Sequence, residues 1–204
     1  MDITNKLNSI VQEGQSLYKK ILDTENYDYF TIPLNCANLV EPEENKRSKY
    51  PLPEKVKECF FVEFDKHNKP SRKLNEKTCL YFIEFPQKES DNILSKYIEY
   101  KEYKDINDIT RINERNSSGL KKSPNSNTNI LYVGKVKKDL GGRLSTHFGY
   151  AHPKTGGLQL RHWINKDLEL TVHIIAFDDK IDDFVNPLEL MLTKKLNPLI
   201  GKSK

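Results

Sequence analysis

Five polar side chains of this chain have types that together could hydrolyse a phosphodiester bond. In chain order they are Tyr81, Tyr132, Arg143, His147 and Glu189. Such a hydrolysis needs an activated water, a positive charge for the transition state and help for the leaving oxygen. An arginine presents a charged fork that fits phosphate oxygens, a histidine exchanges protons near neutral pH, and a carboxylate is a hard ligand for Mg²⁺ or Mn²⁺. The five residues therefore supply the groups that this chemistry requires.

The two tyrosines lie in segments that predict β-strands. Tyr81 belongs to Thr78 to Phe85 and Tyr132 to Asn129 to Val136, and both segments are rich in β-branched and aromatic residues. Tyrosines on neighbouring strands can direct their hydroxyls to one place, so we expect these two to converge.

The other three residues lie in segments that predict helices. Arg143 and His147 are four positions apart, which places both on one face of a helix from Leu140 to Phe148 with Asp139 as its N-cap. Glu189 follows the Asn186-Pro187 pair, read as an N-cap and a first helical position, in a helix that runs to about Lys195.

The rest of the chain predicts further elements in irregular order. We expect an amphipathic helix at Ile3 to Leu22, an irregular arm over residues 24–57, a strand at Glu58 to Phe64 joined to the next strand by a hairpin-like connection, a helical segment at Asn92 to Ile106, and a strand at Leu168 to Phe177. Helices and strands mix without a repeated strand–helix–strand unit, which indicates an α+β domain.

The polar residues occur in an order that resembles the GIY-YIG nuclease family. In that family a G-I-Y strand pairs with a Y-I-G strand, an R-x-x-x-H helix follows, and one glutamate lies on a later helix. Here the counterparts are Cys79-Leu80-Tyr81, Tyr132-Val133-Gly134, Arg143 with His147, and Glu189. The resemblance covers about residues 78–202 and is most specific in the stretch LYVGKVKKDLGGRLSTHF. Taken singly, each residue also has an ordinary explanation, such as a strand aromatic or a solvated helix face.

The resemblance implies roles for these residues. Tyr81 would orient or deprotonate the attacking water, Tyr132 would hydrogen-bond on the substrate side, and Glu189 would bind Mg²⁺ or Mn²⁺. Because a tyrosine has a pKa of about 10, Tyr81 could act as a base only where a cation such as Arg143 favours the phenolate. Whether Tyr81 or His147 handles the proton of the water is left open by the sequence.

The resemblance also implies a domain organisation. A small central antiparallel sheet flanked by helices would occupy residues 78–204, with an insertion at 86–128 between the two signature strands. Residues 1–77 would add a helix, an arm and a strand. In the family an asparagine often follows the proline after the glutamate helix, whereas here the nearby candidate, Asn197, precedes Pro198.

The charge distribution suggests where a phosphate backbone would bind. Residues 1–128 hold 21 basic and 21 acidic side chains, whereas residues 129–204 hold 12 basic and 8 acidic ones. The basic excess therefore lies in the last part of the chain. The residues expected to contact DNA are Lys135, Lys137, Lys138, Lys154 and Arg161.

Composition limits the location and the cysteine chemistry. No apolar run reaches membrane-spanning length and the first 25 residues lack a signal-peptide layout, so we expect a cytoplasmic protein. The three cysteines, Cys36, Cys59 and Cys79, form no C-x-x-C pair, and we expect reduced thiols with neither a disulfide framework nor a zinc site.

The sequence thus predicts a metal-dependent DNA endonuclease of the type II restriction kind. The arm and the insertion would supply specificity, and a homodimer would serve to cut both strands. Two alternatives remain: a structure-selective repair or mobile-element nuclease, and an accessory protein that keeps the fold and binds DNA without cutting it.

Overall fold

The computed structural model describes residues 27–42, 52–68, 73–106, 117–120, 127–152, 154–177 and 184–201, together with Gln12, Ser16 and Lys19. The helix expected at Ile3 to Leu22 lies outside the described residues except at these last three positions. Within the described ranges no helix is long and apolar enough to cross a membrane.

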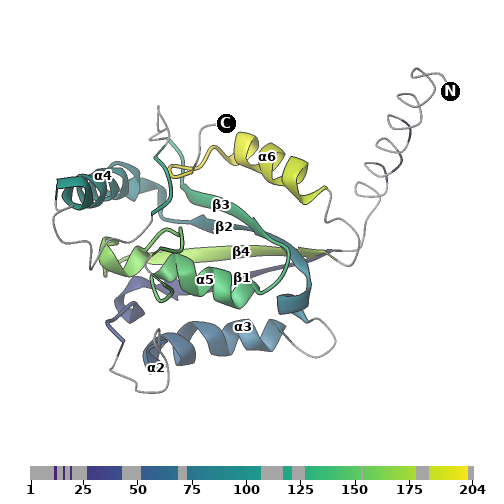
Figure 1. Cartoon of the computed structure of the whole chain (residues 1–204), viewed down its shortest axis with the longest axis horizontal. Helices are drawn as coiled ribbons and strands as arrows, with labels where there is room; N and C mark the ends of the chain where they lie inside the picture. The colour runs from purple at the N-terminus through teal and green to yellow at the C-terminus, as the bar shows by residue number, and fades with distance from the viewer. Residues whose placement is uncertain are drawn as a thin grey trace.

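The centre of the protein is a four-stranded sheet in which every pairing is antiparallel. Its strands are β1 (Tyr27–Asn35), β2 (Thr78–Glu84), β3 (Ile130–Val136) and β4 (Glu169–Phe177), in the spatial order β1-β4-β2-β3. Helices lie around this sheet, as Figure 1 shows. The expected α+β class with an antiparallel sheet is therefore confirmed, and so are the expected strands that became β2, β3 and β4.

Strand β1 contradicts the irregular arm predicted for residues 24–57. It pairs with β4 along its whole length, and its inward side chains Phe30, Ile32 and Leu34 are buried. The alternation that marks a half-buried strand was present, but Pro33 obscured it. A proline is tolerated there because β1 is an edge strand, which needs ladder hydrogen bonds on one side only.

The strand predicted at Glu58 to Phe64 is also wrong, because this segment is helical. Helix α2 (Glu54–Val56) continues through a π-helical turn, η2 (Lys57–Phe61), into α3 (Val62–His67). Val56, Phe60 and Phe64 are spaced by four residues and all three are buried, whereas Val62 is 51% exposed. The spacing of the buried residues, and not their β-branched and aromatic character, determined the structure. The hairpin-like connection to β2 is consequently absent.

Helix α4 (Ser90–Ile106) confirms the helical first half of the insertion at 86–128. Ile93 and Tyr97 bury their side chains in the main core. Of the second half of the insertion, the structure describes residues 117–120 and 127–128. Residues 117–120 form two short β-bridges to the core, Ser117 with Gly157 and Leu120 with Ile200.

Helix α5 (Leu140–Phe148) has the bounds and the cap that the sequence predicted, since the Asp139 side chain accepts a hydrogen bond from the Gly142 amide at 3.0 Å. A short 3₁₀ turn, η5 (Leu160–His162), precedes β4. The remaining 3₁₀ turns are η1 (Cys36–Asn38), η3 (Leu74–Glu76) and η4 (Gln87–Glu89).

Helix α6 (Val185–Leu196) begins two residues earlier than predicted. Its N-cap is Phe184, so Asn186 lies inside the helix and the expected Asn cap is wrong. Pro187 is the third helical residue, where an amide has no intrahelical partner to lose. Asn197 ends the helix in the left-handed conformation, with φ of 46°.

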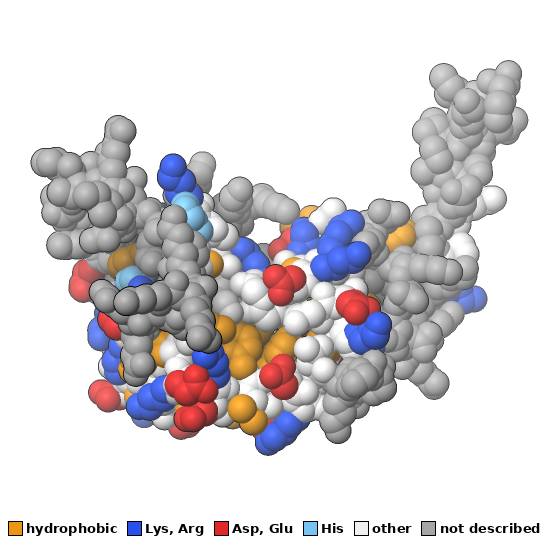
Figure 2. Space-filling view, turned by 60° about the horizontal axis from the view of Figure 1, so that its bottom comes forward, with side chains coloured by type: hydrophobic (Ala, Val, Ile, Leu, Met, Phe, Trp, Pro, Cys, Tyr) orange, Lys and Arg blue, Asp and Glu red, His pale blue; other side chains and the backbone are white. Residues whose placement is uncertain are grey.

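The helices cover the sheet from different sides. In Figure 1, α6 lies along the β3 side, α2 and α3 lie below β1, and α5 lies in front of the sheet. A small second hydrophobic cluster, formed by Leu80, Phe177 and Val185, packs α6 against the sheet. Viewed from the α3 side, the surface mixes basic and acidic side chains around a central hydrophobic group (Figure 2).

Candidate active site

Tyr81 lies at the centre of the candidate site because β2 is an interior strand of the sheet. Its side chain is fully buried, and its neighbour on β3 is Gly134. A Cβ at Gly134 would lie 2.5 Å from the Tyr81 hydroxyl and 2.7 Å from Cε1 of Tyr132. The glycine of the Tyr132-Val133-Gly134 signature is therefore required sterically, since it makes room for both tyrosine rings.

Helix α5 brings two donors to the Tyr81 oxygen. The Arg143 Nε donates to it at 3.2 Å, and the His147 Nε2 lies 2.8 Å from it. The start of this helix is held by Asn75, whose side chain accepts from the Gly141 amide at 3.0 Å. The i, i+4 spacing predicted this shared face, whereas the contribution of Asn75 had no signal in the sequence pattern.

The surroundings of His147 define its protonation state. The ring is fully buried, and burial together with the nearby Arg143 charge lowers its pKa well below the usual value of 6.5. Its Nδ1 accepts a hydrogen bond from the Leu158 amide at 3.2 Å. A neutral imidazole that accepts at Nδ1 carries its proton on Nε2. His147 therefore donates to the Tyr81 oxygen.

The Tyr81 oxygen consequently accepts two hydrogen bonds, one from a cation. Burial is the largest influence on this hydroxyl and raises its pKa, the neighbouring Tyr132 raises it further, and Arg143 opposes both. In the resting protein Tyr81 is a phenol whose own proton is left to donate elsewhere. Deprotonation would place the new negative charge between two N–H donors already in position.

Tyr132 borders the same centre, as the sequence predicted. Its ring centroid lies 6.3 Å from that of Tyr81 and 4.7 Å from that of His147. The side chain is half-buried, and burial raises its pKa while the charge of Arg143 and a hydrogen bond from it act in the opposite direction. The two hydroxyls thus share one arginine.

Glu189 reaches the site from α6 and is paired with a lysine of β3. Its Oε2 lies 2.7 Å from the Lys135 Nζ, and both side chains are largely buried. The charge of Glu189 also acts on both tyrosines and raises the pKa of Tyr81 and of Tyr132. All five candidate residues therefore belong to one region. Lys135, expected to contact DNA, forms an ion pair inside it.

Two loop peptides complete the site and were missed by sequence reasoning. The Gly156 carbonyl accepts a hydrogen bond from the Arg143 Nη1 at 2.9 Å, and the Leu158 amide donates to the His147 ring. Gly157, between them, lies close to α5, because a Cβ there would lie 2.7 Å from the Thr146 carbonyl oxygen. Backbone groups leave no residue-type signal; only the glycine pair hinted at a close approach.

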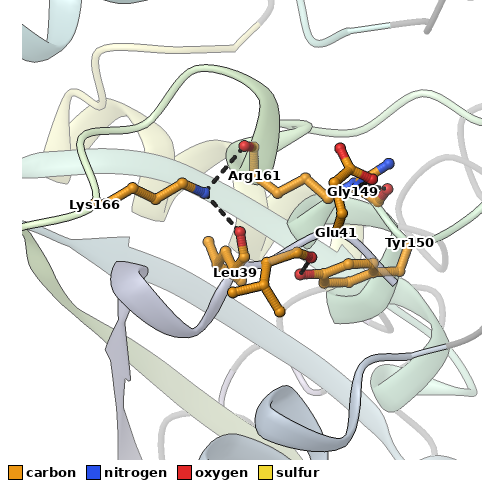
Figure 3. A network of polar contacts seen from close by, with 7 residues as sticks. Leu39, Glu41, Gly149, Tyr150, Arg161 and Lys166 are labelled. Carbon is orange, nitrogen blue, oxygen red and sulfur yellow. Dashed lines mark hydrogen bonds and ion pairs between the residues drawn. The ribbon is translucent and has the colours of Figure 1, made fainter. Parts of the chain in front are cut away.

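The remaining expected DNA contacts have different surroundings. Lys137, Lys138 and Lys154 are exposed. Arg161 instead donates to the Gly149 carbonyl at 2.9 Å and pairs with Glu41, so its guanidinium ties the end of α5 to the segment after β1 (Figure 3). Its side chain is 8% exposed, which leaves little of it to meet a phosphate.

A second polar cluster lies on the sheet face opposite Leu170 and Val172. His173 lies on that face and is buried, with 9% of its surface exposed. Tyr29 lies 2.7 Å from its Nδ1, Glu84 lies 2.7 Å from its Nε2, and the Phe82 ring stacks on it at 4.1 Å. Both ring nitrogens therefore have hydrogen-bond partners.

The residues present fit one hard divalent cation held by a single carboxylate. Within the described residues no group of three His, Cys, Asp or Glu side chains could hold a metal ion. Glu189 alone would leave most coordination positions to water and phosphate oxygens, as Mg²⁺ prefers. Such an ion would compete with the Lys135 ammonium for the same oxygen.

The comparisons with known proteins add no relative to this description. No model of a protein family, no curated protein and no solved structure matches the chain.

Proposed function

We propose that this protein is a metal-dependent nuclease of the GIY-YIG kind that hydrolyses phosphodiester bonds in DNA. The observation that carries the proposal is the Tyr81 oxygen, which accepts hydrogen bonds from Arg143 and His147 of one helix beside Tyr132 and Glu189. Within that class we propose a restriction-type endonuclease, in which the additions to the core select the target.

In the proposed mechanism Tyr81 takes the proton of the attacking water or orients that water. His147 cannot take it, because the ring is buried, neutral and bonded at both nitrogens. Arg143 is charged and donates to the Tyr81 oxygen through Nε, while its Nη1 donates to the Gly156 carbonyl. Its charge favours the phenolate and the negative transition state of phosphate attack.

Glu189 would hold a Mg²⁺ or Mn²⁺ ion, which would supply Lewis-acid polarisation of the phosphate. Lys135 would then lose its partner. Its ammonium would be left beside the incoming phosphate, so the residue would contribute to DNA binding only after the ion pair opens. The exposed Lys137 and Lys138 on the same turn would also contact the DNA backbone.

The decisive experiment is cleavage of plasmid and varied genomic DNA by the purified protein with Mg²⁺ or Mn²⁺. Tyr81→Phe and Glu189→Gln should reduce cleavage by about 10²-fold or more, the size of effect that loss of one transition-state group produces. Tyr150→Phe is the matched control, because it removes a tyrosine hydroxyl that donates to the Val40 carbonyl at 2.8 Å outside the site. Discrete fragments that require Tyr81 and Glu189 support a restriction-type enzyme. Absence of cleavage with every metal and substrate, while DNA binding persists, refutes the nuclease.

The Lys135–Glu189 ion pair favours one competing function, a DNA-binding protein that does not cut. In that case the ammonium neutralises Glu189 permanently and no cation binds. Titration calorimetry with Mn²⁺ distinguishes the two. If the protein is a nuclease, the Lys135→Met variant should bind Mn²⁺ more tightly than the natural protein. If it is a non-cleaving protein, neither the natural protein nor the variant should bind Mn²⁺ at Glu189.

A further inference from the structure

We propose that Tyr97, on helix α4 of the 86–128 insertion, is a positioning residue for Arg143 and His147. This inference rests on the proposed function for its catalytic consequence. It assigns to the insertion a part in building the site, beyond any part in choosing the target. The argument starts from the loop peptides that hold the two α5 side chains.

Gly156, Gly157 and Leu158 form the support of both catalytic side chains. The Gly156 carbonyl fixes the Arg143 guanidinium at 2.9 Å and the Leu158 amide fixes the His147 ring at 3.2 Å. Any shift of this three-residue strip therefore moves the two donors of the Tyr81 oxygen together.

The hydroxyl of Tyr97 reaches this strip through residues 117–120. It donates to the Ser118 carbonyl at 2.5 Å, and the Ser118 amide donates to the Gly157 carbonyl at 2.9 Å. The same short segment is held on its other side, where the Gly201 amide donates to the Gly119 carbonyl at 3.0 Å. Two consecutive hydrogen bonds thus connect Tyr97 to the middle of the strip.

The ring of Tyr97 reaches the strip by a second route. It packs against Trp163 with ring centroids 4.8 Å apart, and the Trp163 indole donates to the Leu158 carbonyl at 2.8 Å. Leu158 is therefore held at its carbonyl by Trp163 and bound at its amide by His147. Both rings of this contact are buried, so the support is rigid and not a surface contact.

The Tyr97 side chain thus supports two adjacent residues of the strip, Gly157 through its hydroxyl and Leu158 through its ring. The strip lies close against α5, because a Cβ at Gly157 would lie 2.7 Å from the Thr146 carbonyl oxygen. It is consequently fixed between α5 on one side and Tyr97 with its partners on the other. Displacements of about 1 Å at a reacting centre can cost about 10²-fold in rate, so a loosened support should be visible in catalysis.

The test compares Tyr97→Phe, which removes the hydroxyl route, with Tyr97→Leu, which removes both routes. Tyr150→Phe is the matched control, since it loses a similar buried hydroxyl bond to a carbonyl with no link to the strip. The first measurement is ¹⁵N NMR of the imidazole rings, which reports whether Nδ1 or Nε2 of His147 carries the proton. The second is the single-turnover cleavage rate beside the Kd for DNA.

We expect one His147 tautomer, protonated on Nε2, in the natural protein and in Tyr150→Phe. In Tyr97→Phe the His147 signals should shift, and in Tyr97→Leu both tautomers should be populated. The single-turnover rate should fall about tenfold and about 10²-fold respectively. The Kd for DNA should change less than twofold. Far-ultraviolet circular dichroism must show that each variant keeps the fold.

The two measurements separate this inference from the proposed function. If the natural protein cleaves no DNA but the His147 tautomer responds to Tyr97, the positioning role stands and the nuclease proposal fails. If folded Tyr97→Leu keeps the His147 signals of the natural protein, the positioning role is refuted whatever the cleavage result. A tenfold weaker Kd at an unchanged rate would also overturn it, because Tyr97 would then serve substrate binding.

Discussion

Replacement of Gly134 by alanine is a direct test of the packing beneath the two tyrosines. The backbone at this position is ordinary strand, so alanine meets no conformational penalty of its own. The added methyl group, however, would lie 2.5 Å from the Tyr81 hydroxyl oxygen, 2.6 Å from its Cζ and 2.7 Å from Cε1 of Tyr132. Ordinary carbon contacts are about 3.5–4 Å, so both rings must move by about 1 Å.

The loss of unfolding free energy in Gly134→Ala depends on whether the rings of Tyr81 and Tyr132 can move away from the added methyl group. Tyr81 is fully buried under α5 and cannot rotate outward, whereas the half-buried Tyr132 can. Overpacking of a buried site costs about 1–3 kcal/mol of unfolding free energy, and the rigid position of Tyr81 favours the upper half of that range. The same 1 Å shift would separate the Tyr81 oxygen from Arg143 and His147, and for the proposed nuclease cleavage should fall by about 10²-fold.

Urea unfolding, monitored by circular dichroism, measures the change in unfolding free energy that Gly134→Ala causes. Gly156→Ala is the matched control, because a Cβ there meets nothing within 4 Å, and its stability should change by less than about 0.5 kcal/mol. A double-mutant cycle with Tyr81→Leu, which lacks the two clashing Tyr81 atoms, should recover at least about 1 kcal/mol of the Gly134→Ala loss. If Gly134→Ala is as stable as the natural protein, the close packing of Tyr81 against this strand is wrong.

Three further outcomes are expected. Cys36 and Cys79 are buried with pKa values raised to about 12 by burial, so at pH 8 a thiol reagent should label exposed Cys59 alone until urea unfolds the chain. The pKa of His147 is lowered in the folded protein, so below about pH 6.5 the unfolded chain takes up a proton that the folded chain does not. The contribution of His147 to the free energy of unfolding should therefore be constant above that pH and fall by up to about 1.4 kcal/mol per pH unit below it. The slope measured by urea unfolding at several pH values should shrink in His147→Gln. Residues 78–204 expressed alone lack β1 and α3, and the fragment should show no cooperative unfolding by circular dichroism.

The sequence was sufficient to predict secondary structure where the local signals all favoured the same element. The strand around Tyr132 and the helix carrying Arg143 were predicted with nearly their observed bounds, because hydrophobic pattern, turn residues and the Asp139 cap all agree there. The residue types of the candidate site could be read in the same way, since their order along the chain is a local property.

The sequence failed where two signals conflicted. In β1 the proline argued against a strand, and only the position at the sheet edge, a tertiary fact, removes the conflict. In the α2–α3 segment, aromatic and β-branched composition argued for a strand, whereas the four-residue spacing of Phe60 and Phe64 argued for a helix. Burial of that spaced face against the core decided in favour of the helix.

The candidate site also combines features that the local sequence predicts with features that depend on the folded structure. Residue type predicted that an arginine and a histidine share a helix face, but the neutral state of His147 depends on burial and on the Leu158 amide, neither of which is encoded locally. The Lys135–Glu189 pair also joins positions 54 residues apart on different elements. Such contacts exist only once the fold has formed.

Strand β1, which precedes residue 78, and helix α4, which lies within residues 86–128, are part of the hydrophobic core and not appendages. Phe30, Ile32 and Leu34 of β1 are packed in the same hydrophobic cluster as Tyr81, and so are Ile93 and Tyr97 of α4. Each fully buried side chain of this kind contributes about 1.5–3 kcal/mol, so the three β1 residues alone match much of the 5–15 kcal/mol stability of a typical domain. Sequence change in β1 or α4 therefore alters the setting of Tyr81 directly. The recognition role proposed for these elements would evolve under the constraint that Tyr81 keeps its two hydrogen-bond donors.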